Sequence, residues 1–270
     1  MIIDFHTHVF PDKIASKTIE ILSQKGCITP YTDGSVDGLL SAMKEANVDI
    51  AVCLPVVTKP SQFDSINRFA LEINERFRCD ERRLISFAGI HPKCENISEK
   101  MRFIKDSGFV GVKIHPDYQE TFINDEGYIE IINNARELDL VVITHAGVDA
   151  GYRDMPARCT PELALEVIRK TGHKKLVFAH LGANEMPERV LSVLCGQDVY
   201  FDTALILKGT SENTFKEILD KHGADKILFA TDSPWSGIEN DVNIIRSYNL
   251  EKETENKIFC ENAKRLLGIR

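Results

Sequence analysis

The stretch Asp4-Phe5-His6-Thr7-His8 closes the first apolar run of the chain, which begins at Met1. If this run is a β-strand, side chains two residues apart point the same way, so His6 and His8 project together from its carboxyl end. Two imidazoles in that place form one half of a metal site. A His-x-His pair alone is a weak signal, because such pairs are common by chance and also occur at plain surface strand ends.

Three further apolar runs end in a residue that can bind a metal. These are residues 140–144, followed by His145; residues 175–179, followed by His180; and residues 226–231, followed by Asp232. Together with the first run, four strand ends therefore offer imidazole or carboxylate ligands, which suit Zn²⁺ and also Mn²⁺, Fe²⁺ or Co²⁺. This coincidence favours a metal site over the alternative that Asp232-Ser-Pro only caps a helix.

Eight β-type runs alternate with helical patterns along the whole chain. The expected strands cover residues 1–5, 49–57, 84–90, 109–114, 140–144, 176–179, 199–202 and 227–231. The expected helices cover residues 11–24, 36–46, 61–77, 97–107, 125–138, 161–171, 184–194, 211–222 and the closing stretch 237–267. Eight such units predict an α/β fold of the closed (β/α)8 TIM-barrel type. A Rossmann-like or flavodoxin-like sheet is the alternative, but no G-x-G-x-x-G follows an early strand.

The composition fits a protein that works in water. With 43% hydrophobic and 27% charged residues, and no apolar run near the ~20 residues that cross a bilayer, the sequence predicts no membrane association. A net charge of -8 argues against nucleic acid as a partner, because phosphate binding needs clustered Lys and Arg. The seven cysteines form no C-x-x-C pair and the chain does not begin like a secretory signal, so we expect reduced thiols and a cytoplasmic protein.

Six motifs distributed over the chain carry a resemblance to a known family. They are Asp4-Phe5-His6-Thr7-His8, Gly111-Val-Lys113-Ile-His115-Pro116, Thr144-His145-Ala-Gly147, Ala179-His180-Leu-Gly182, Ala230-Thr-Asp232-Ser-Pro-Trp235 and Asn262-Ala-Lys-Arg-Leu-Leu-Gly268. With these motifs the chain resembles the amidohydrolase superfamily, in the amidohydrolase-related branch. That branch includes lactonases, other hydrolases and aminocarboxymuconate-semialdehyde-type decarboxylases.

The resemblance implies a role for each strand-end residue. His6, His8 and His145 would bind a divalent metal together with Asp232. His180 would either bind a second metal or act as an acid or base on the substrate. Asp232 would accept the proton of a water activated by the metal and pass it to the leaving group, which is general base followed by general acid catalysis.

The chemical state of Lys113 distinguishes a two-metal site from a one-metal site. In two-metal members of the superfamily a lysine of the fourth strand is carboxylated and bridges both ions, and burial helps because it lowers the pKa of the lysine amine. An unmodified Lys113 would instead hold a substrate carboxylate or stabilise an oxyanion. We expect one ion, most simply Zn²⁺, with Mn²⁺ as an alternative and a second ion as an option.

The residues that contact the substrate are harder to predict, because loops carry them. We expect Lys113, His115, Arg153 and Trp235 to contact a small-molecule substrate, and we name Tyr31, Lys59 and Arg158 as further candidates. The bland alternatives are a structural role for His115 and plain surface positions for the cations. His91, His173 and His222 are expected to be structural, with the last two solvated or capping helices.

We therefore expect residues 1–270 to form a single metal-dependent hydrolase barrel domain that cleaves an amide, lactone or ester bond of a small polar substrate. The first alternative is a metal-dependent decarboxylase of a small carboxylic acid. The second is a non-catalytic metal-binding barrel, against which the presence of both Asp232 and His180 speaks. Assembly into a homo-oligomer is left open.

Overall fold

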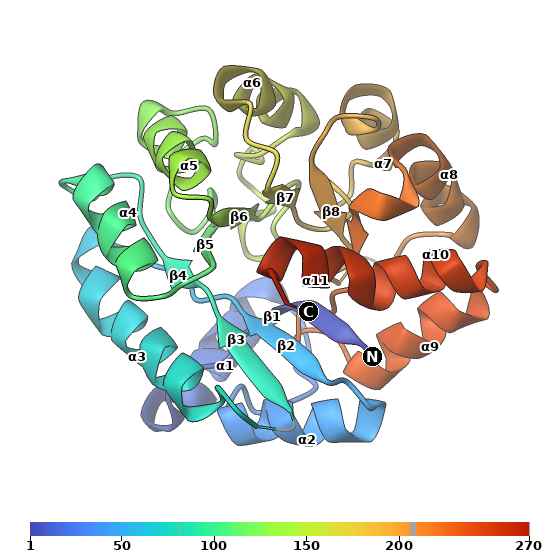
Figure 1. Ribbon diagram of the computed structural model, residues 1–270, viewed down its shortest axis with the longest axis horizontal. Coiled ribbons are helices and arrows are strands. Elements are labelled where there is room, and N and C mark those ends of the chain that lie inside the picture. Colours follow the sequence, from blue (N-terminus) through green and yellow to red (C-terminus); the bar gives the residue numbers. More distant parts are fainter. Residues whose placement is uncertain (81, 206–208, 270) are drawn as a thin grey trace.

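A barrel of parallel β-strands surrounded by helices makes up the computed structural model, which describes residues 1–80, 82–205 and 209–269 (Figure 1). The strands are β1 (Ile3–Thr7), β2 (Ile50–Cys53), β3 (Arg83–Ser86), β4 (Ala88–Gly89), β5 (Gly111–Ile114), β6 (Val141–Thr144), β7 (Leu176–Phe178), β8 (Tyr200–Asp202) and β9 (Ile227–Leu228). β3 and β4 are the two parts of one predicted strand, which is interrupted at Phe87. All eight predicted strand positions are therefore occupied, and the α/β barrel is the fold.

The barrel closes through hydrogen bonds between its first strand, β1, and the segment that follows its last strand, β9. β1, β2 and β3 pair in that order, and β4 to β9 pair in chain order, with every pair parallel. The Phe5 amide donates to the Phe229 carbonyl at 2.9 Å, and the Asp232 amide donates to the His6 carbonyl at 2.8 Å. The carboxylate of Asp4 also accepts from the Thr231 hydroxyl at 2.6 Å. The first and last strands thus lie side by side.

Helices cover the outside of the barrel. They are α1 (Asp12–Gly26), α2 (Val36–Ala46), α3 (Phe63–Arg76), α4 (Ile97–Asp106), α5 (Glu126–Glu137), α6 (Pro161–Thr171), α7 (Pro187–Arg189), α8 (Glu212–His222), α9 (Ile238–Ser247), α10 (Lys252–Asn256) and α11 (Asn262–Leu267). The helix expected from residue 184 begins only at Pro187, because Asn184 forms a β-bridge with Gly147, and it continues as a π-helix over Val190–Leu194. Among the described residues, no helix has both the length and the apolar character to cross a bilayer.

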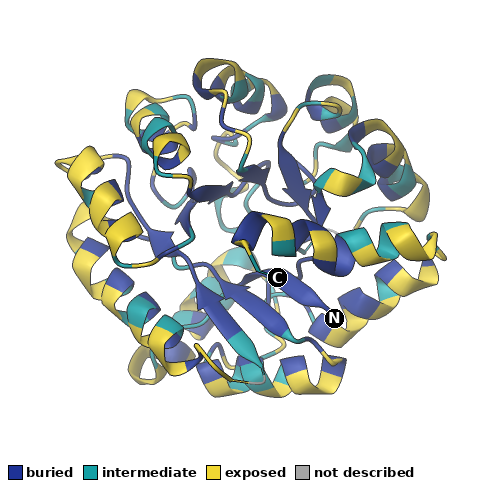
Figure 2. Ribbon diagram, in the orientation of Figure 1, coloured by how far each residue is buried: buried dark blue, intermediate teal, exposed yellow. Residues whose placement is uncertain are grey.

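The core has two layers, which follow from the alternation of side chains along each strand. Val141 and Ile143 belong to a cluster inside the barrel, whereas Val142 packs outward against the helices. Figure 2 shows buried strands within a ring of helices whose outer faces are exposed. The interior cluster also includes Leu266 and Leu267 of α11, which crosses the barrel beside the start of β1 in Figure 1. The amino end is thereby covered, and the polar strand-end residues gather at the carboxyl end.

Candidate metal centre

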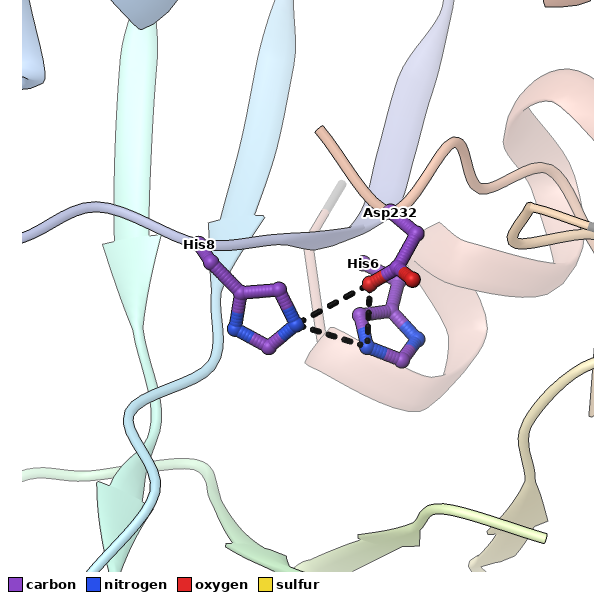
Figure 3. A group of neighbouring side chains, drawn as sticks. All are labelled: His6, His8 and Asp232. Atoms are coloured by element: carbon purple, nitrogen blue, oxygen red, sulfur yellow. Dashed lines mark hydrogen bonds and ion pairs between the residues drawn. The ribbon is translucent and has the colours of Figure 1, made fainter. Parts of the chain in front are cut away.

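Three ligand atoms from the first and last strands meet at the carboxyl end of the barrel. His6 Nε2 lies 3.2 Å from His8 Nε2, and Asp232 Oδ1 lies 3.3 Å from His6 Nε2 and 3.0 Å from His8 Nε2. Figure 3 shows both rings turned toward the Asp232 carboxylate. These separations suit three atoms that share one divalent cation, because metal-ligand bonds of about 2.0–2.2 Å place neighbouring ligands at such distances.

The hydrogen-bond partners of the two outer nitrogens decide where the protons lie. His6 Nδ1 lies 2.8 Å from Asp202 Oδ2, and His8 Nδ1 lies 2.8 Å from the Leu54 carbonyl oxygen. A carboxylate and a carbonyl accept hydrogen bonds, so each Nδ1 carries the proton and each Nε2 presents a lone pair. Three electron-pair donors then converge with no proton among them. A shared cation removes their mutual repulsion, and the residues therefore fit a metal.

The charge states agree with this fit. Burial lowers the pKa of His6 well below its usual value, and nearby Lys113 adds to that effect, so the imidazole is neutral as a metal ligand must be. For Asp232, burial alone raises the pKa, but the neighbouring histidines outweigh it and bring the pKa to about 2. Asp232 is therefore ionised at neutral pH.

Local backbone irregularities aim these side chains. The β1-β2 register shifts between Asp4 and Thr7, and this bulge lets His6 join the cavity although Phe5 also packs inside the barrel. Asp232 has a φ of +65°, in the left-handed region that residues other than glycine seldom adopt. Backbone strain of this kind gathers at functional sites, where the surrounding structure maintains it.

His180 and His145 lie beside the three-atom cluster. The His180 ring centroid is 5.6 Å from that of His6, and His180 Nε2 lies 2.9 Å from His145 Nδ1. His180 Nδ1 faces the Ala204 carbonyl oxygen at 2.9 Å, which again places the lone pair of His180 on Nε2. The structure therefore brings His6, His8 and Asp232 together directly. His145 reaches this group through His180.

Lys113 points into the same cavity from β5, as the alternation with outward-facing Val112 and Ile114 predicts. Its Nζ lies 3.1 Å from His6 Nε2. Burial lowers the pKa of Lys113 to about 8, although the charges of Asp202 and other carboxylates oppose the shift. About a tenth of the amine is thus neutral at pH 7, which is the form that reacts with CO2 or binds a cation.

A second group of possible ligands lies behind His145. The rings of His115 and His145 stack with centroids 4.4 Å apart and planes 7° apart. His115, His145 and Asp149 each offer a ligand atom within 4.8 Å of the others. Asp117 completes this group, with its Oδ2 at 3.8 Å from His145 Nε2.

The cationic residues predicted to contact the substrate differ in whether they are exposed or buried. Arg153 is exposed and forms an ion pair with Glu185, so it does not reach the cavity, and Lys59 is also exposed. Arg158 is buried and faces Asp117, with Nη1 at 3.5 Å from Oδ1.

Trp235 lines a pocket of about 480 Å³ at the carboxyl end of the barrel. The other lining residues are Ile28, Thr29, Pro30, Tyr31 and Leu205.

Three histidines lie outside the cluster and have structural partners. His91 Nδ1 accepts a hydrogen bond from the Lys93 amide. His173 and His222 are buried, and their Nε2 atoms lie 2.9 Å and 3.0 Å from the carbonyl oxygens of Leu140 and Val199. The expectation that these two are solvated or cap helices is wrong, because each bonds to the start of a neighbouring strand.

Sequence reasoning gave no role to three buried or half-buried carboxylates. Asp202 ends β8 and was recognisable as a strand-end residue, but its bond to His6 Nδ1 depends on the barrel bringing β8 and β1 together. Asp117 and Asp149 lie in loops after β5 and β6, and their only signal in the sequence is a position two or four residues after a cavity histidine.

Comparisons with known proteins place this site in context. The model of the amidohydrolase family matches residues 3–269. No curated protein matches the chain in sequence.

Among solved structures, 2,6-dihydroxybenzoate decarboxylase from Rhizobium is similar with a TM-score of 0.74 and 17% identity, over 99% of this chain and 98% of that one. A dihydroxybenzoic acid decarboxylase from Polaromonas with bound manganese and 2-nitroresorcinol gives 0.72 and 15%, over 99% and 96%. A probable 2-pyrone-4,6-dicarboxylic acid hydrolase from Acinetobacter baumannii gives 0.69 and 17%, over 99% of both chains. Identities this low show a shared fold. The family match over almost the whole chain goes further, and the protein belongs to the amidohydrolase family.

Proposed function

We propose that this protein is a divalent-metal-dependent decarboxylase that removes CO2 from a small aromatic carboxylic acid. The observation that carries the proposal is the convergence of three unprotonated ligand atoms, from His6, His8 and Asp232, at the carboxyl end of the barrel. Two of the three structural relatives described above are decarboxylases of aromatic acids, which supports decarboxylation over the hydrolysis expected from the sequence.

His6, His8 and Asp232 would hold the ion, with His145 and His180 in reach to complete its coordination. The expected content is one ion per chain. When bound, the cation supplies a Lewis acid that polarises oxygen atoms of the substrate. Both Mn²⁺ and Zn²⁺ suit this set of nitrogen and carboxylate ligands, and manganese is the ion in the Polaromonas relative.

The pocket lined by Tyr31 and Trp235 suits one aromatic ring, and it adjoins the candidate ligands through the backbone contact of Trp235 with Asp232. Trp235 follows Asp232 closely, and its amide donates to the Asp232 carbonyl at 2.8 Å. The Tyr31 amide donates to the Pro234 carbonyl at 2.7 Å, which brings the loop after α1 to the same place. A volume of about 480 Å³ lies within the range of small-molecule sites. We propose that Tyr31 and Trp235 bound the apolar part of the substrate.

Decarboxylation requires a proton for the ring carbon. As the carbon-carbon bond breaks, CO2 leaves and its electron pair remains on the ring carbon, which takes up one proton. Asp232 is a carboxylate at neutral pH, so it must first accept a proton from the substrate or a water before it donates one. His180 Nε2 faces the same cavity and is the second candidate for this transfer.

Hydrolysis of a lactone is the second candidate, and the buried Lys113 amine favours it. Its lowered pKa of about 8 suits carboxylation of the amine and a second ion beside the first. The Acinetobacter baumannii relative is named as a hydrolase of a pyrone dicarboxylic acid.

One experiment separates the two reactions. Protein loaded with Mn²⁺ or Zn²⁺ is offered hydroxybenzoates and, in parallel, lactones in ¹⁸O-labelled water. We expect CO2 release from a hydroxybenzoate, with turnover reduced at least ~10²-fold in Asp232→Asn but not in the exposed control Asp220→Asn. Solvent oxygen in a ring-opened product would instead establish the hydrolase. Absence of metal-dependent turnover with either panel would leave the non-catalytic metal-binding barrel.

A further inference from the structure

Four histidines line the cavity, and they differ in the hydrogen-bond partner of the ring nitrogen that points away from it, here called the outer nitrogen. His6 has Asp202 behind its outer nitrogen, His8 has the Leu54 carbonyl and His180 has the Ala204 carbonyl, each at 2.8–2.9 Å. Within the described part of the chain, the outer nitrogen of His145, Nε2, has no hydrogen-bond partner although it is buried. A buried polar atom without a partner requires an explanation, because it has lost its hydrogen bonds to water and gained none in return.

Two carboxylates face this nitrogen. Asp117 Oδ2 lies 3.8 Å from His145 Nε2, and Asp149 Oδ2 lies 4.0 Å from it. Asp117 Oδ2 is itself buried and has no hydrogen-bond partner among the residues the structure describes. Both distances exceed a hydrogen bond and suit either a bridging water or a small rotation of the carboxylate.

The remaining oxygens and the neighbouring ring fix this arrangement. Asp149 Oδ1 accepts from the Gly151 amide at 2.8 Å, and Asp117 Oδ1 accepts from the Arg158 amide at 3.4 Å. Each carboxylate therefore has one oxygen bound to a loop and the other turned toward the stacked rings of His115 and His145. The Tyr118 amide donates to His115 Nδ1, so the Nε2 proton of His115 points toward Asp149 Oδ2 at 3.5 Å.

The single proton of neutral His145 has two alternative positions. On Nδ1 it donates to His180 Nε2, and the Nε2 lone pair then faces two carboxylates, which is unfavourable. On Nε2 it points toward the carboxylates, and the Nδ1 lone pair then lies beside the lone pair of His180 Nε2 in the cavity. Only the second arrangement makes His145 a ligand on the cavity side.

We propose that Asp117 and Asp149 are positioning residues that hold the proton of His145 on Nε2 and so keep its Nδ1 available to a cation. They act as Asp202 does for His6, from the opposite side of the cavity. The inference rests on the proposed function only in taking the cavity to be a metal site. Carboxylates behind a ligating histidine commonly raise metal affinity by about 10–100-fold.

The test compares Asp149→Asn, and the double variant Asp117→Asn/Asp149→Asn, with the wild type and with Asp154→Asn. Asp154 is exposed on the same loop as Asp149, so its variant makes the same change of charge away from His145. Asparagine keeps the Oδ1 acceptor for Gly151, so the single variant retains the loop if the double variant does not fold. ¹⁵N-histidine NMR of metal-free protein, with His145 assigned from its absence in His145→Gln, reports which nitrogen carries the proton.

We expect Nε2 protonation of His145 in the wild type and in Asp154→Asn, and a shift of the proton to Nδ1 in the other variants. Calorimetric titration with Zn²⁺ should show dissociation constants raised about 10–100-fold in the same variants. Nδ1 protonation of wild-type His145, or unchanged NMR spectra and affinities in the variants, would overturn the inference. So would a second bound Zn²⁺ that disappears in Asp149→Asn, since a cation would then occupy the gap. None of these readouts uses turnover, so a failure of the proposed decarboxylation remains distinguishable.

Discussion

Asp202→Asn should weaken metal binding without unfolding the barrel. In the wild type, Asp202 Oδ2 accepts the Nδ1 proton of His6 at 2.8 Å, while Oδ1 accepts from the amides of His180 at 2.8 Å and Ala204 at 3.1 Å. Asparagine preserves the Oδ1 bonds and places an NH2 group, which only donates, against His6 Nδ1. The proton of His6 must then move to Nε2, where it can donate to the carboxylate of Asp232.

The size of the effect follows from this exchange. A hydrogen bond to a charged group is worth about 1.5–3 kcal/mol, which corresponds to about 10–100-fold in a dissociation constant. The metal-free protein loses little, because the His6 proton exchanges Asp202 for Asp232 as its acceptor, and the only contact that weakens is that of Lys113 Nζ with His6 Nε2 among the described residues. Burial also raises the pKa of Asp202, which shows that its ionised form is costly there. We therefore expect a metal affinity lower by about 10–100-fold and a melting temperature of the metal-free protein that does not fall.

The measurement is competition for Zn²⁺ with a chromophoric chelator, together with thermal unfolding of the metal-free protein. Asp220→Asn is the matched control, since Asp220 is exposed on α8. An affinity within about twofold of the wild type, a difference of only about 0.4 kcal/mol, would refute the argument that Asp202 sets the proton position of His6. A large loss of melting temperature would show that Asp202 chiefly holds the barrel together.

Three further predictions concern single side chains. His6→Ala and His8→Ala should each lower metal content and turnover together while the circular dichroism spectrum is retained, and full metal occupancy in the double variant would exclude β1 from the site. Lys113→Met should leave about one ion per chain by elemental analysis, whereas a fall from two ions to one would identify a carboxylated bridge. Burial raises the pKa of Asp4 to about 8, above its ordinary 3.8, so the folded state binds this proton more tightly, and stability should fall as the pH rises from 3.8 to about 8 and level off above that. Asp4→Asn should flatten that fall in thermal unfolding, and an unchanged slope would show that Asp4 does not titrate this way.

The barrel and the convergence of His6, His8 and Asp232 were predictable because each depends on a regular feature of the sequence. Alternating strands and helices require parallel pairing, and parallel pairing brings all carboxyl ends to one rim. A histidine or aspartate at the end of such a strand therefore reaches the rim wherever it stands in the chain. The Nε2 atoms of His6 and His8 and the Oδ1 atom of Asp232 accordingly lie within 3.3 Å of one another.

The remaining parts of the site depend on loop geometry and on the choice of proton position, which have no periodic signal. Arg153 follows the same strand as His145, yet the loop turns it outward to Glu185, while Asp149 from the same loop turns inward. The bulge that aims His6 is likewise a local register shift. His145 was predicted as a direct ligand on equal terms with His6, and that role remains a proposal.

The covering of the barrel's amino end by α11 has a kinetic consequence. Apolar side chains, among them Leu266 and Leu267, fill the interior between the two ends. Within the part of the chain that the structure describes, the amino end is thus closed, and the proposed ion, substrate and products would enter and leave at the carboxyl rim. A bound aromatic acid would block access to the ion from solvent. Saturating substrate should therefore slow the extraction of metal by a chelator, and the ion should exchange only between turnovers.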